Sequence, residues 1–410
     1  NNVAVGGGAL ITDTLGSKSV AIGTDALSAQ NFTTATDSLN TAVGHRAGVA
    51  VTTGIQNTLI GSLAGDALTD ADFNVAVGHT SLGSDTLGSK SVALGGYTLA
   101  NQNFTTATDS LNVAVGHLAG FQVTTGIQNT LIGALAGDAT TGGGSNVAVG
   151  YVSLSEDRLG SFSTAIGHQA LANQNFTTAT NAFNVAVGHN AGVVVTTGTQ
   201  NVLIGSLAGK NLGAGANNVI VGHTAGAHSV GLATGAQNVI LGNFADTTAV
   251  NTTNANVLGF DVSGAAGFTT LGNGTADIRA QHGIITWATV SDERYKKDIV
   301  DSTAGLSLIN ALRPRTFKYK TLGELPETFR VYKAESTEVF KNTQTNHGFI
   351  AQEIKAALDA DDSIKDGFRL WDERDDGSQE VAEAALIPVL VKAIQEQSAL
   401  ITALTARITT

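Results

Sequence analysis

Ser291 and Lys296 are the two residues of this chain whose types and spacing could support covalent chemistry. A serine hydroxyl becomes a nucleophile when a base takes its proton, and a lysine amine can be that base only when its pKa falls from about 10.4 towards neutrality. The nearby cations Arg294 and Lys297 favour a neutral amine, as burial would. Residues five apart lie on opposite faces of a strand and well apart around a helix, so contact between the two requires an irregular turn or a second chain.

The same residues also have a purely structural interpretation. Ser291 and Asp292 form a common start for a helix, and the charged residues from Glu293 to Lys297 could form a solvated face. From these residues alone, both interpretations stay open.

Ser291 stands where the composition of the chain changes. Residues 1–290 hold 6 Lys and Arg and 14 Asp and Glu, whereas the last 120 residues hold 16 and 20. Of the 49 glycines, 44 precede residue 291. A chain of 410 residues is also too long for one compact core. The sequence therefore predicts a thin, repetitive part followed by an ordinary globular domain.

The bulk composition narrows the classes of partner. A net charge of -12 without a basic stripe argues against nucleic acid. The chain has no cysteine, so disulfides and thiolate metal sites are excluded. It shows no signal peptide and no apolar run long enough for a membrane span, so we expect no membrane insertion. Because it begins at Asn1 without methionine, we expect it to be the C-terminal part of a longer protein.

A short motif of the form Asn/Ser-x-apolar-Val/Ile/Leu-Gly repeats through the first part of the chain. Its glycine occurs fourteen times, at 6, 23, 44, 61, 78, 95, 116, 133, 150, 167, 188, 205, 222 and 242. The larger unit of 72 residues maps Gly6 onto Gly78, Gly150 and Gly222. Intervals of mainly 17 or 21 residues are too short for a helix plus a strand, and the apolar residues are largely β-branched, so each copy predicts strand, turn, strand. Stacked copies give a β-solenoid.

Three positions of the repeat carry specific expectations. The Val or Ile directly before each glycine is expected to point inward. The residue four before the glycine is Asn in eleven copies and Ser at Ser19, Ser91 and Ser163, which predicts a stacked polar ladder that caps the turns. The glycine permits a tight corner or a positive φ.

Histidine directly follows six of the repeat glycines, and stacking could bring these side chains into a row. No single copy has the spacing of metal ligands, so we expect solvent-facing or inter-chain roles and predict no metal and no cofactor. The six are His45, His79, His117, His168, His189 and His223.

The 21-residue intervals contain the segment Asn-Phe-Thr-Thr-Ala-Thr, at 31–36, 103–108 and 175–180. The additional residues are expected to loop outward from a rigid scaffold, where binding sites are common. Phe32, Phe104, Phe176 and Tyr97 are therefore the candidate receptor-binding residues.

The repeat resembles the head domains of trimeric autotransporter adhesins and the shafts of many phage tail fibres, over residues 1 to about 246. This resemblance implies a parallel β-roll assembled as a homotrimer. The coil lengths differ from those of adhesin heads. We expect a shaft at 1–246, a β-rich neck at 247–290 and an α+β domain at 291–410, so the fold class is mainly β.

Residues 291–410 are similar to the endosialidase-type intramolecular chaperones. The likeness rests on 291–296, Phe317 to Tyr319, His347 to Glu353 and Ala385 to Pro388. It implies a domain that trimerises, templates folding of the shaft, and removes itself in a single turnover with Ser291 as nucleophile and Lys296 as base. Tyr295 departs from the family pattern, which has leucine there. We expect cleavage between Val290 and Ser291, with the bond between Ser291 and Asp292 as the alternative.

The final helix has isoleucine at strict seven-residue spacing, at Ile387, Ile394, Ile401 and Ile408, with Leu390, Gln397 and Leu404 between them. This pattern predicts a coiled coil. Ile and Leu at these positions often give dimers, whereas the resemblance implies three chains, and we expect the trimer.

Together the two resemblances imply a virion tail fibre, assembled in the host cytoplasm, that attaches to a host receptor such as a surface glycan or outer-membrane component. One alternative is a non-catalytic trimeric surface adhesin, but the chain does not end in membrane strands as such adhesins do. The other is a glycan-degrading tailspike, which needs paired carboxylates in a repeat region that has few.

Overall fold

The computed structural model of the protein describes residues 1–284, 286–361, 364 and 368–409. Of the segments singled out above, the predicted neck includes Ile285, which lies outside these residues, and the C-terminal domain includes 362–363, 365–367 and 410, which do as well. The chain forms two compact units, Asn1–Ser291 and Asp292–Thr410, each with its own hydrophobic core.

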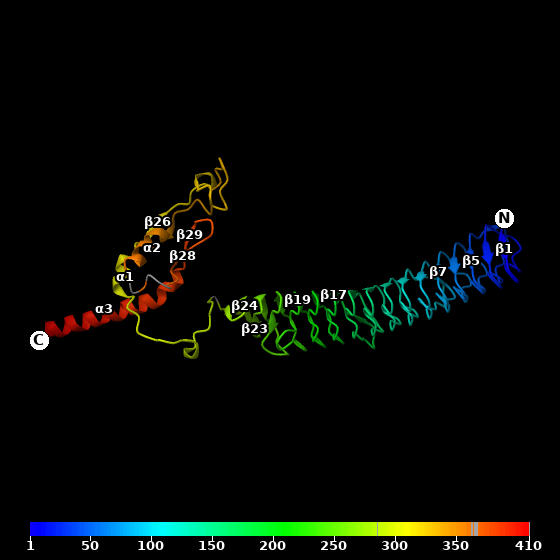
Figure 1. Cartoon of the computed structure of the whole chain (residues 1–410), viewed down its shortest axis with the longest axis horizontal. Helices are drawn as coiled ribbons and strands as arrows, with labels where there is room; N and C mark the ends of the chain where they lie inside the picture. Colours follow the sequence, from blue (N-terminus) through cyan, green and yellow to red (C-terminus); the bar gives the residue numbers. More distant parts are fainter. Residues whose placement is uncertain (285, 362–363, 365–367, 410) are drawn as a thin grey trace. The chain divides into compact units, whose positions relative to one another are not determined.

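The first unit is a parallel β-solenoid of about 16 turns, which confirms the predicted mainly β fold (Figure 1). Each coil contributes one short strand to a long sheet, and each strand pairs in parallel with the strand one coil further on. These strands are β1 (Val3–Val5), β3 (Val20–Ile22), β5 (Thr41–Val43), β6 (Thr58–Ile60), β7 (Val75–Val77), β9 (Val92–Leu94), β11 (Val113–Val115), β12 (Thr130–Ile132), β13 (Val147–Val149), β15 (Thr164–Ile166), β17 (Val185–Val187), β18 (Val202–Ile204), β19 (Val219–Val221), β20 (Val239–Leu241), β22 (Asn256–Phe260) and β24 (Phe268–Asn273).

The sheet extends beyond the last recognisable repeat. Strands β22 and β24 stack on β20 in parallel register, and Gly259 and Gly272 continue the column of repeat glycines. β25 (Ala276–Gln281) then pairs with β24 in the antiparallel direction. The predicted boundary between shaft and neck at residue 246 therefore falls inside the sheet, and the turns number about 16 where the repeat glycines number fourteen.

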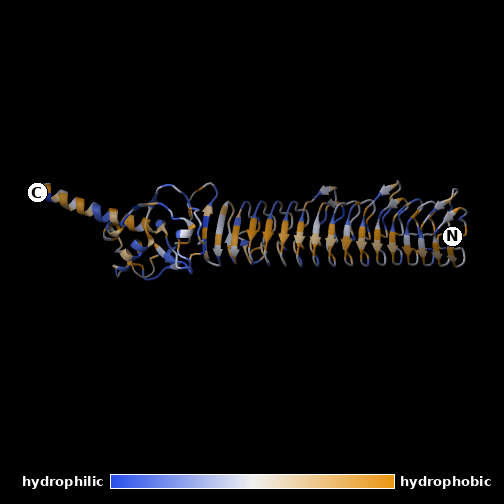
Figure 2. Ribbon diagram, turned by 90° about the horizontal axis from the view of Figure 1, so that it is seen from above, coloured by the Kyte–Doolittle hydropathy of each residue, from blue (hydrophilic) through white to orange (hydrophobic). Residues whose placement is uncertain are grey.

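Shorter strands form separate two-stranded parallel sheets beside the main one. Three of these pairs recur every 72 residues, and we call them ridges one, two and three; Figure 2 shows them standing out from the side of the shaft. Ridge one is β2 (Gly16–Ser17) with β4 (Thr36–Asp37), ridge two is β8 (Gly88–Ser89) with β10 (Thr108–Asp109), and ridge three is β14 (Gly160–Ser161) with β16 (Thr180–Asn181). A fourth pair joins β21 (Asp246–Thr247) and β23 (Ser263–Gly264).

The middle residue of each main-sheet strand points into the shaft. In β12, Leu131 is fully buried, whereas Thr130 is partly exposed and Ile132 is 38% exposed. Side chains alternate between the two faces of a strand, so the residue directly before the glycine must point outward when its predecessor points inward. The expectation that the Val or Ile before the glycine points inward is therefore wrong, and the outer face of the sheet carries apolar residues.

Repeat glycines line the corner at which the chain leaves each strand. At Gly133 the φ is +132°, a conformation that side-chain-bearing residues rarely adopt. A Cβ there would lie 2.5 Å from the carbonyl oxygen of Gly150, one coil further on. Both the backbone conformation and the close approach of the next coil therefore require glycine.

The predicted polar ladder is present, and it lies inside the shaft. The Asn129 carboxamide oxygen accepts a hydrogen bond from the backbone N–H of Asn146 (3.0 Å), and its amide nitrogen donates to the carbonyl oxygen of Gly143 (3.0 Å). The N–H of Asn129 in turn donates to the side chain of Asn112 (2.9 Å). Each asparagine thus connects two coils through groups that are completely buried.

Serine replaces asparagine in the ladder where the long coils begin, and a glutamine completes the pattern. Gln102 donates from its amide nitrogen to Ser91 Oγ (3.0 Å) and to the buried Asp85 (2.6 Å), and its oxygen accepts from Asn112 (2.9 Å). Equivalent contacts are made by Gln30 and Gln174. The additional residues of the long coil therefore supply the amide that the short serine lacks.

The second unit is a small α+β domain. Its elements are η1 (Glu293–Tyr295), α1 (Leu306–Ala311), β26 (Arg315–Phe317), η2 (Leu322–Glu324), β27 (Asn346–Gly348), α2 (Ala351–Asp359), β28 (Trp371–Glu373), β29 (Gln379–Val381), η3 (Glu383–Ala385) and α3 (Leu386–Thr409). Strands β26 and β27 form one antiparallel pair, and β28 and β29 form another.

The core of this domain gathers α1, α2 and the first turns of α3. Leu308, Ile354 and Val389 are buried together. Glu396 on α3 accepts a hydrogen bond from the backbone N–H of Leu306 at the start of α1 (2.8 Å), which satisfies one of the free N–H groups of that helix. The rest of α3 extends past this core with its apolar residues exposed.

Replacing Asn129 with alanine should destabilise the shaft. The substitution leaves the buried N–H of Asn146 and the C=O of Gly143 without their side-chain partner, at a cost of about 1–3 kcal/mol for each unsatisfied group. The urea midpoint of unfolding of the shaft measures this loss. Gln128→Ala, at the exposed neighbouring residue, is the control and should leave the midpoint unchanged. An Asn129→Ala midpoint equal to that of the control would contradict the ladder.

Asp138 should make the shaft more stable at acid than at neutral pH. Burial raises the pKa of this carboxyl to about 6, and the charge of Glu156 acts in the same direction. The neutral acid is therefore favoured in the folded chain. Stability is greatest below the ordinary pKa of about 3.8 and is lost as the pH rises through about 6. Asp138→Asn should raise the free energy of unfolding at pH 7 by about 1 kcal/mol after solvent screening, and by nothing at pH 3. A variant whose advantage is the same at both pH values would contradict this role.

Candidate functional site at residue 291 and candidate binding residues

The two units of the chain meet at Ser291, which is the last residue of the first unit, while Asp292 begins the second. Val290 is 59% exposed, and Ser291 is exposed as well. The backbone on both sides of the predicted scissile bond is thus on the surface of the single chain.

A single 3-10 turn, η1 (Glu293–Tyr295), follows the serine. Asp292 caps this turn by accepting a hydrogen bond from the backbone N–H of Arg294 (2.9 Å). The Arg294 guanidinium also binds the same carboxylate through Nε (3.0 Å) and Nη2 (2.6 Å), which holds the pKa of Asp292 below its usual range. In the structural interpretation considered above, the cap is therefore Asp292, and the element is one short turn.

Lys296 is the residue that ends this turn. Its backbone N–H donates to the carbonyl oxygen of Glu293 (2.9 Å), and its own backbone is extended, with φ -117° and ψ 149°. The η1 turn therefore lies between the serine and the lysine in the chain. The serine belongs to the first unit and the lysine to the second.

The three phenylalanines of the Asn-Phe-Thr-Thr-Ala-Thr segments lie inside the shaft. Phe32, Phe104 and Phe176 are 5%, 6% and 6% exposed. A Cβ on Gly88 would lie 2.8 Å from the Phe104 ring, which therefore packs directly beneath ridge two. These rings therefore pack inside the shaft instead of facing outward, whereas the first two threonines and the alanine of each segment are exposed, as are Asn31 and Asn103.

Tyr97 is exposed, and it belongs to a row of rings on one corner of the shaft. Its ring lies edge-on between His79 (5.2 Å between centroids) and His117 (6.2 Å). His168 and His189 stack nearly parallel, with their centroids 5.2 Å apart and their planes inclined by 17°. The Nδ1 atoms of His79 and His117 each donate to a carbonyl oxygen of the preceding coil at 3.2 Å. Within the residues that the structure describes, no three His, Cys, Asp or Glu side chains gather as a metal site.

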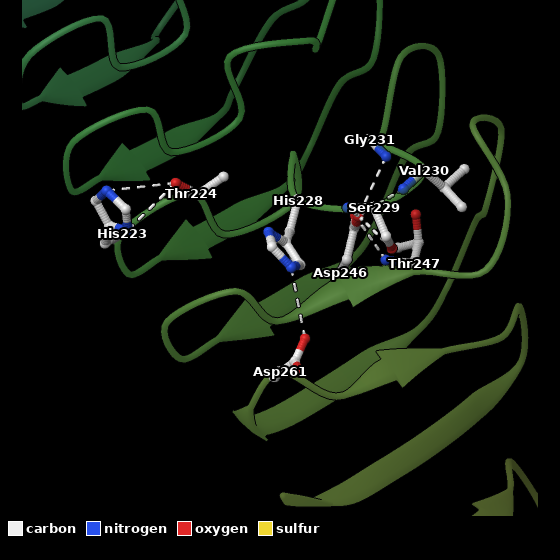
Figure 3. A network of polar contacts seen from close by, with 9 residues as sticks. All are labelled: His223, Thr224, His228, Ser229, Val230, Gly231, Asp246, Thr247 and Asp261. Carbon is white, nitrogen blue, oxygen red and sulfur yellow. Dashed lines mark hydrogen bonds and ion pairs between the residues drawn. The ribbon is translucent and has the colours of Figure 1, made fainter. Parts of the chain in front are cut away.

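Asp246 is the most heavily hydrogen-bonded carboxylate near the end of the repeat region (Figure 3). It is completely buried and accepts from the backbone N–H groups of Ser229 (2.7 Å), Val230 (3.0 Å) and Gly231 (3.1 Å). Its second oxygen accepts from the N–H of Thr247 (2.8 Å). These backbone donors satisfy both carboxyl oxygens, so Asp246 anchors the loop at 229–231 and is a structural residue.

Sequence reasoning missed two surface features. The first is the pair Phe162 and Phe183, whose exposed rings stack in ridge three. Comparison of the copies 72 residues apart would have revealed it, because the corresponding residues are Lys90 and Leu111 in ridge two. The second is the outward-facing apolar side of the main sheet, which strict alternation along each strand would have predicted.

Comparison with known proteins supports one part of this picture directly. Residues 291–362 match the sequence model of the family described as chaperone of endosialidase. No curated protein and no solved structure matches the chain. A β-solenoid followed by a chaperone-of-endosialidase domain fits a tail-fibre-like or tailspike-like protein.

Proposed function

We propose that this chain belongs to a phage tail fibre. Three copies form a shaft that attaches to a host receptor, and the last domain directs their assembly and then releases itself. The observation that carries the proposal is the order of the two parts. The family match begins at residue 291, directly after a β-solenoid whose charge content is far lower.

The outer face of the main sheet supports association of the shafts. Its outward residues are Val, Ile, Leu or Thr in almost every coil, and Ile22, Ile60, Ile132, Ile166 and Ile204 are all more than a third exposed. These apolar residues repeat along the shaft at the strand spacing of about 4.8 Å. A partner that contacts the outward residues of every strand must therefore repeat at the same spacing. Further copies of the shaft, aligned in parallel, meet that condition.

The terminal helix supports association at the other end of the chain. Its seven-residue spaced isoleucines are exposed by 62%, 64%, 65% and 75%, from Ile387 to Ile408, while Leu386, Val389 and Ala393 face the domain core. The segment Glu383–Thr409 is also long and apolar enough to cross a membrane by length and composition. The apolar residues form one stripe, however, and Lys392 and Glu396 lie within the segment, which favours a coiled coil.

The proposed cleavage uses Ser291 as the nucleophile. Lys296 takes the proton from Ser291 Oγ, which attacks the carbonyl carbon of Val290. The bond from that carbon to the Ser291 nitrogen breaks, the nitrogen receives the proton, and an ester joins Val290 to Ser291 Oγ. Water then hydrolyses the ester and restores the hydroxyl. Contact between the serine and the lysine in a trimer, from the same chain or from a neighbouring one, makes cleavage follow assembly.

Cleavage is tested on a denaturing gel, with masses measured for each band. The purified protein should give fragments of 290 and 120 residues, whereas Ser291→Ala and Lys296→Met should give the intact chain of 410. Each variant removes one partner in the proton transfer. Ser302→Ala and Lys333→Met are the matched controls and should still be cut. An uncut wild-type protein, or cleavage of Ser291→Ala at the same bond, refutes the autoproteolysis.

Trimerisation is tested by native mass measurement of the uncut Ser291→Ala protein. It should be three times the chain mass. Ile394→Asp with Ile401→Asp places charges in the helical seam, so the trimer should be lost or the yield of soluble shaft should fall. Gln395→Asp, on an exposed position outside the seam, is the control. A monomeric or dimeric Ser291→Ala protein contradicts the proposed assembly.

A further inference from the structure

Ridge three differs in chemistry from ridges one and two, although the backbone is the same. In ridge one, Lys18 pairs with Asp37 (2.6 Å). In ridge two, Lys90 pairs with Asp109 (2.5 Å). In ridge three, the residues at these places are Phe162 and Asn181, so the ion pair is gone.

A second substitution in ridge three accompanies the first. Leu39 and Leu111 of ridges one and two correspond to Phe183 in ridge three. The rings of Phe162 and Phe183 stack with their centroids 5.3 Å apart and their planes inclined by 18°, and they are 47% and 48% exposed. One exposed ion pair has therefore been replaced by an exposed aromatic platform of two rings.

The backbone at both phenylalanines is strained. Phe162 has a φ of 62° and Phe183 a φ of 50°, in the left-handed region that bulky side chains rarely enter. The register-equivalent residues of neighbouring coils, Gln128, Ser145, Gln200 and Asn217, share this conformation and are polar. Phe73 and Leu111 have the same conformation at the equivalent place of other coils, so it belongs to the coil. What is particular to ridge three is that two exposed rings follow one another in this column and stack.

The surroundings of the platform are polar and uncharged. Along the column of left-handed residues, Ser145 and Gln128 lie on one side and are hydrogen-bonded to each other (3.2 Å), and Gln200 and Asn217 lie on the other. Their hydroxyl and amide groups stand at successive coils, about 4.8 Å apart. Asn181, in place of the aspartate of the other ridges, adds a further amide.

We propose that Phe162 and Phe183 form a binding platform for a neutral saccharide. The axial C–H groups of a sugar ring are positively polarised and pack on the negative face of an aromatic ring, while its hydroxyls need donors and acceptors at the edges of that ring. The two phenyl rings supply the aromatic face for the C–H groups of the sugar. The flanking amides and hydroxyls supply hydrogen-bond donors and acceptors for its hydroxyl groups. Because Phe162 and Asn181 replace the Lys–Asp pair, the platform has no charged group to pair with an acidic or basic ligand, which favours a neutral one. This inference rests on the proposed attachment of the shaft to a host glycan.

The platform borders the outer face of the main sheet, so one alternative to a saccharide has to be tested. A neighbouring copy of the shaft could cover the two rings as part of the trimer. If the rings form a protein interface, replacing them should change the native mass of the assembly. If they form a saccharide site, replacing them should leave that mass unchanged.

The experiment converts ridge three into ridge two. Phe162→Lys, Asn181→Asp and Phe183→Leu are combined in one chain, so each new residue is one that the same backbone already accommodates at Lys90, Asp109 and Leu111. Wild type and variant are applied to an array of neutral and acidic bacterial surface oligosaccharides, and affinity is then measured for the best neutral binder. Native mass and cleavage are recorded in parallel.

Wild type should bind at least one neutral oligosaccharide, and the variant should bind it at least tenfold more weakly with mass and cleavage unchanged. The reverse conversion, Lys90→Phe with Asp109→Asn and Leu111→Phe, should increase binding by adding a second platform. Absence of neutral binders, equal binding by the variant, or a change of native mass overturns the saccharide site. Cleavage and mass report on the proposed fibre independently, so the two ideas can fail separately.

Discussion

The close stacking of consecutive coils is the constraint on which the rest of this shaft depends. At each corner the backbone of one coil passes so near the next that a Cβ at Gly133 would overlap Gly150. The coils must therefore share one backbone path and one register. Register in turn lets Asn112, Asn129 and Asn146 satisfy the buried backbone groups of the neighbouring coil. Without this ladder, a thin shaft would contain many unpaired polar groups and too few apolar contacts to offset them.

The same constraint fixes the volume of the core, because every coil encloses nearly the same cross-section. Where the inward strand residue is a leucine, as at Leu59 and Leu131, the residue four after the following repeat glycine is also a glycine, Gly65 and Gly137. A Cβ on Gly65 would lie 2.8 Å from the Leu59 side chain. Many coils with an inward alanine instead carry a leucine at the second place, as Ala93 and Leu99 do. The two positions compensate in these coils. Where both are small, as at Ala114 and Gly120, Leu99 and Leu131 of the neighbouring coils fill the space.

Much of this architecture could be predicted from the sequence, and the failures have physical causes. The glycine period predicted the stacked coils, and the Asn and Ser at one position predicted the ladder. The direction in which each side chain of a strand points was harder to predict. In β11 the three residues Val, Ala and Val are all apolar, and only the pleat of the strand decides that Ala114 faces inward while Val115 faces outward.

The positions of the three candidate phenylalanines were hard to predict for a related reason. Phe104 was assigned to an outward loop, yet the additional residues of the long coil form ridge two, and the ring fills the space beneath it. An aromatic residue in a polar insertion is more valuable to a thin core than to the surface. Phe162 and Phe183 were overlooked because they lie at regular repeat positions. Their exposure follows from their place five residues before the repeat glycine, where Phe73 and Leu111 are exposed as well.

Two physical properties of the shaft explain why a separate assembly domain is useful to it. A single coil cannot bury its own apolar residues, so stability accumulates only as coils stack, and the first turns are costly to form. The outer face of the sheet is also apolar, and a lone shaft that exposes it is prone to association in the wrong register. In the proposed assembly, a domain with its own core and a helical seam gathers three chain ends before the shafts wind, which fixes both number and register. Once the coils are stacked, neighbouring strands hold one another and the domain is no longer needed. The proposed cleavage would then make disassembly slow, because the chains could no longer retrace the route by which they met.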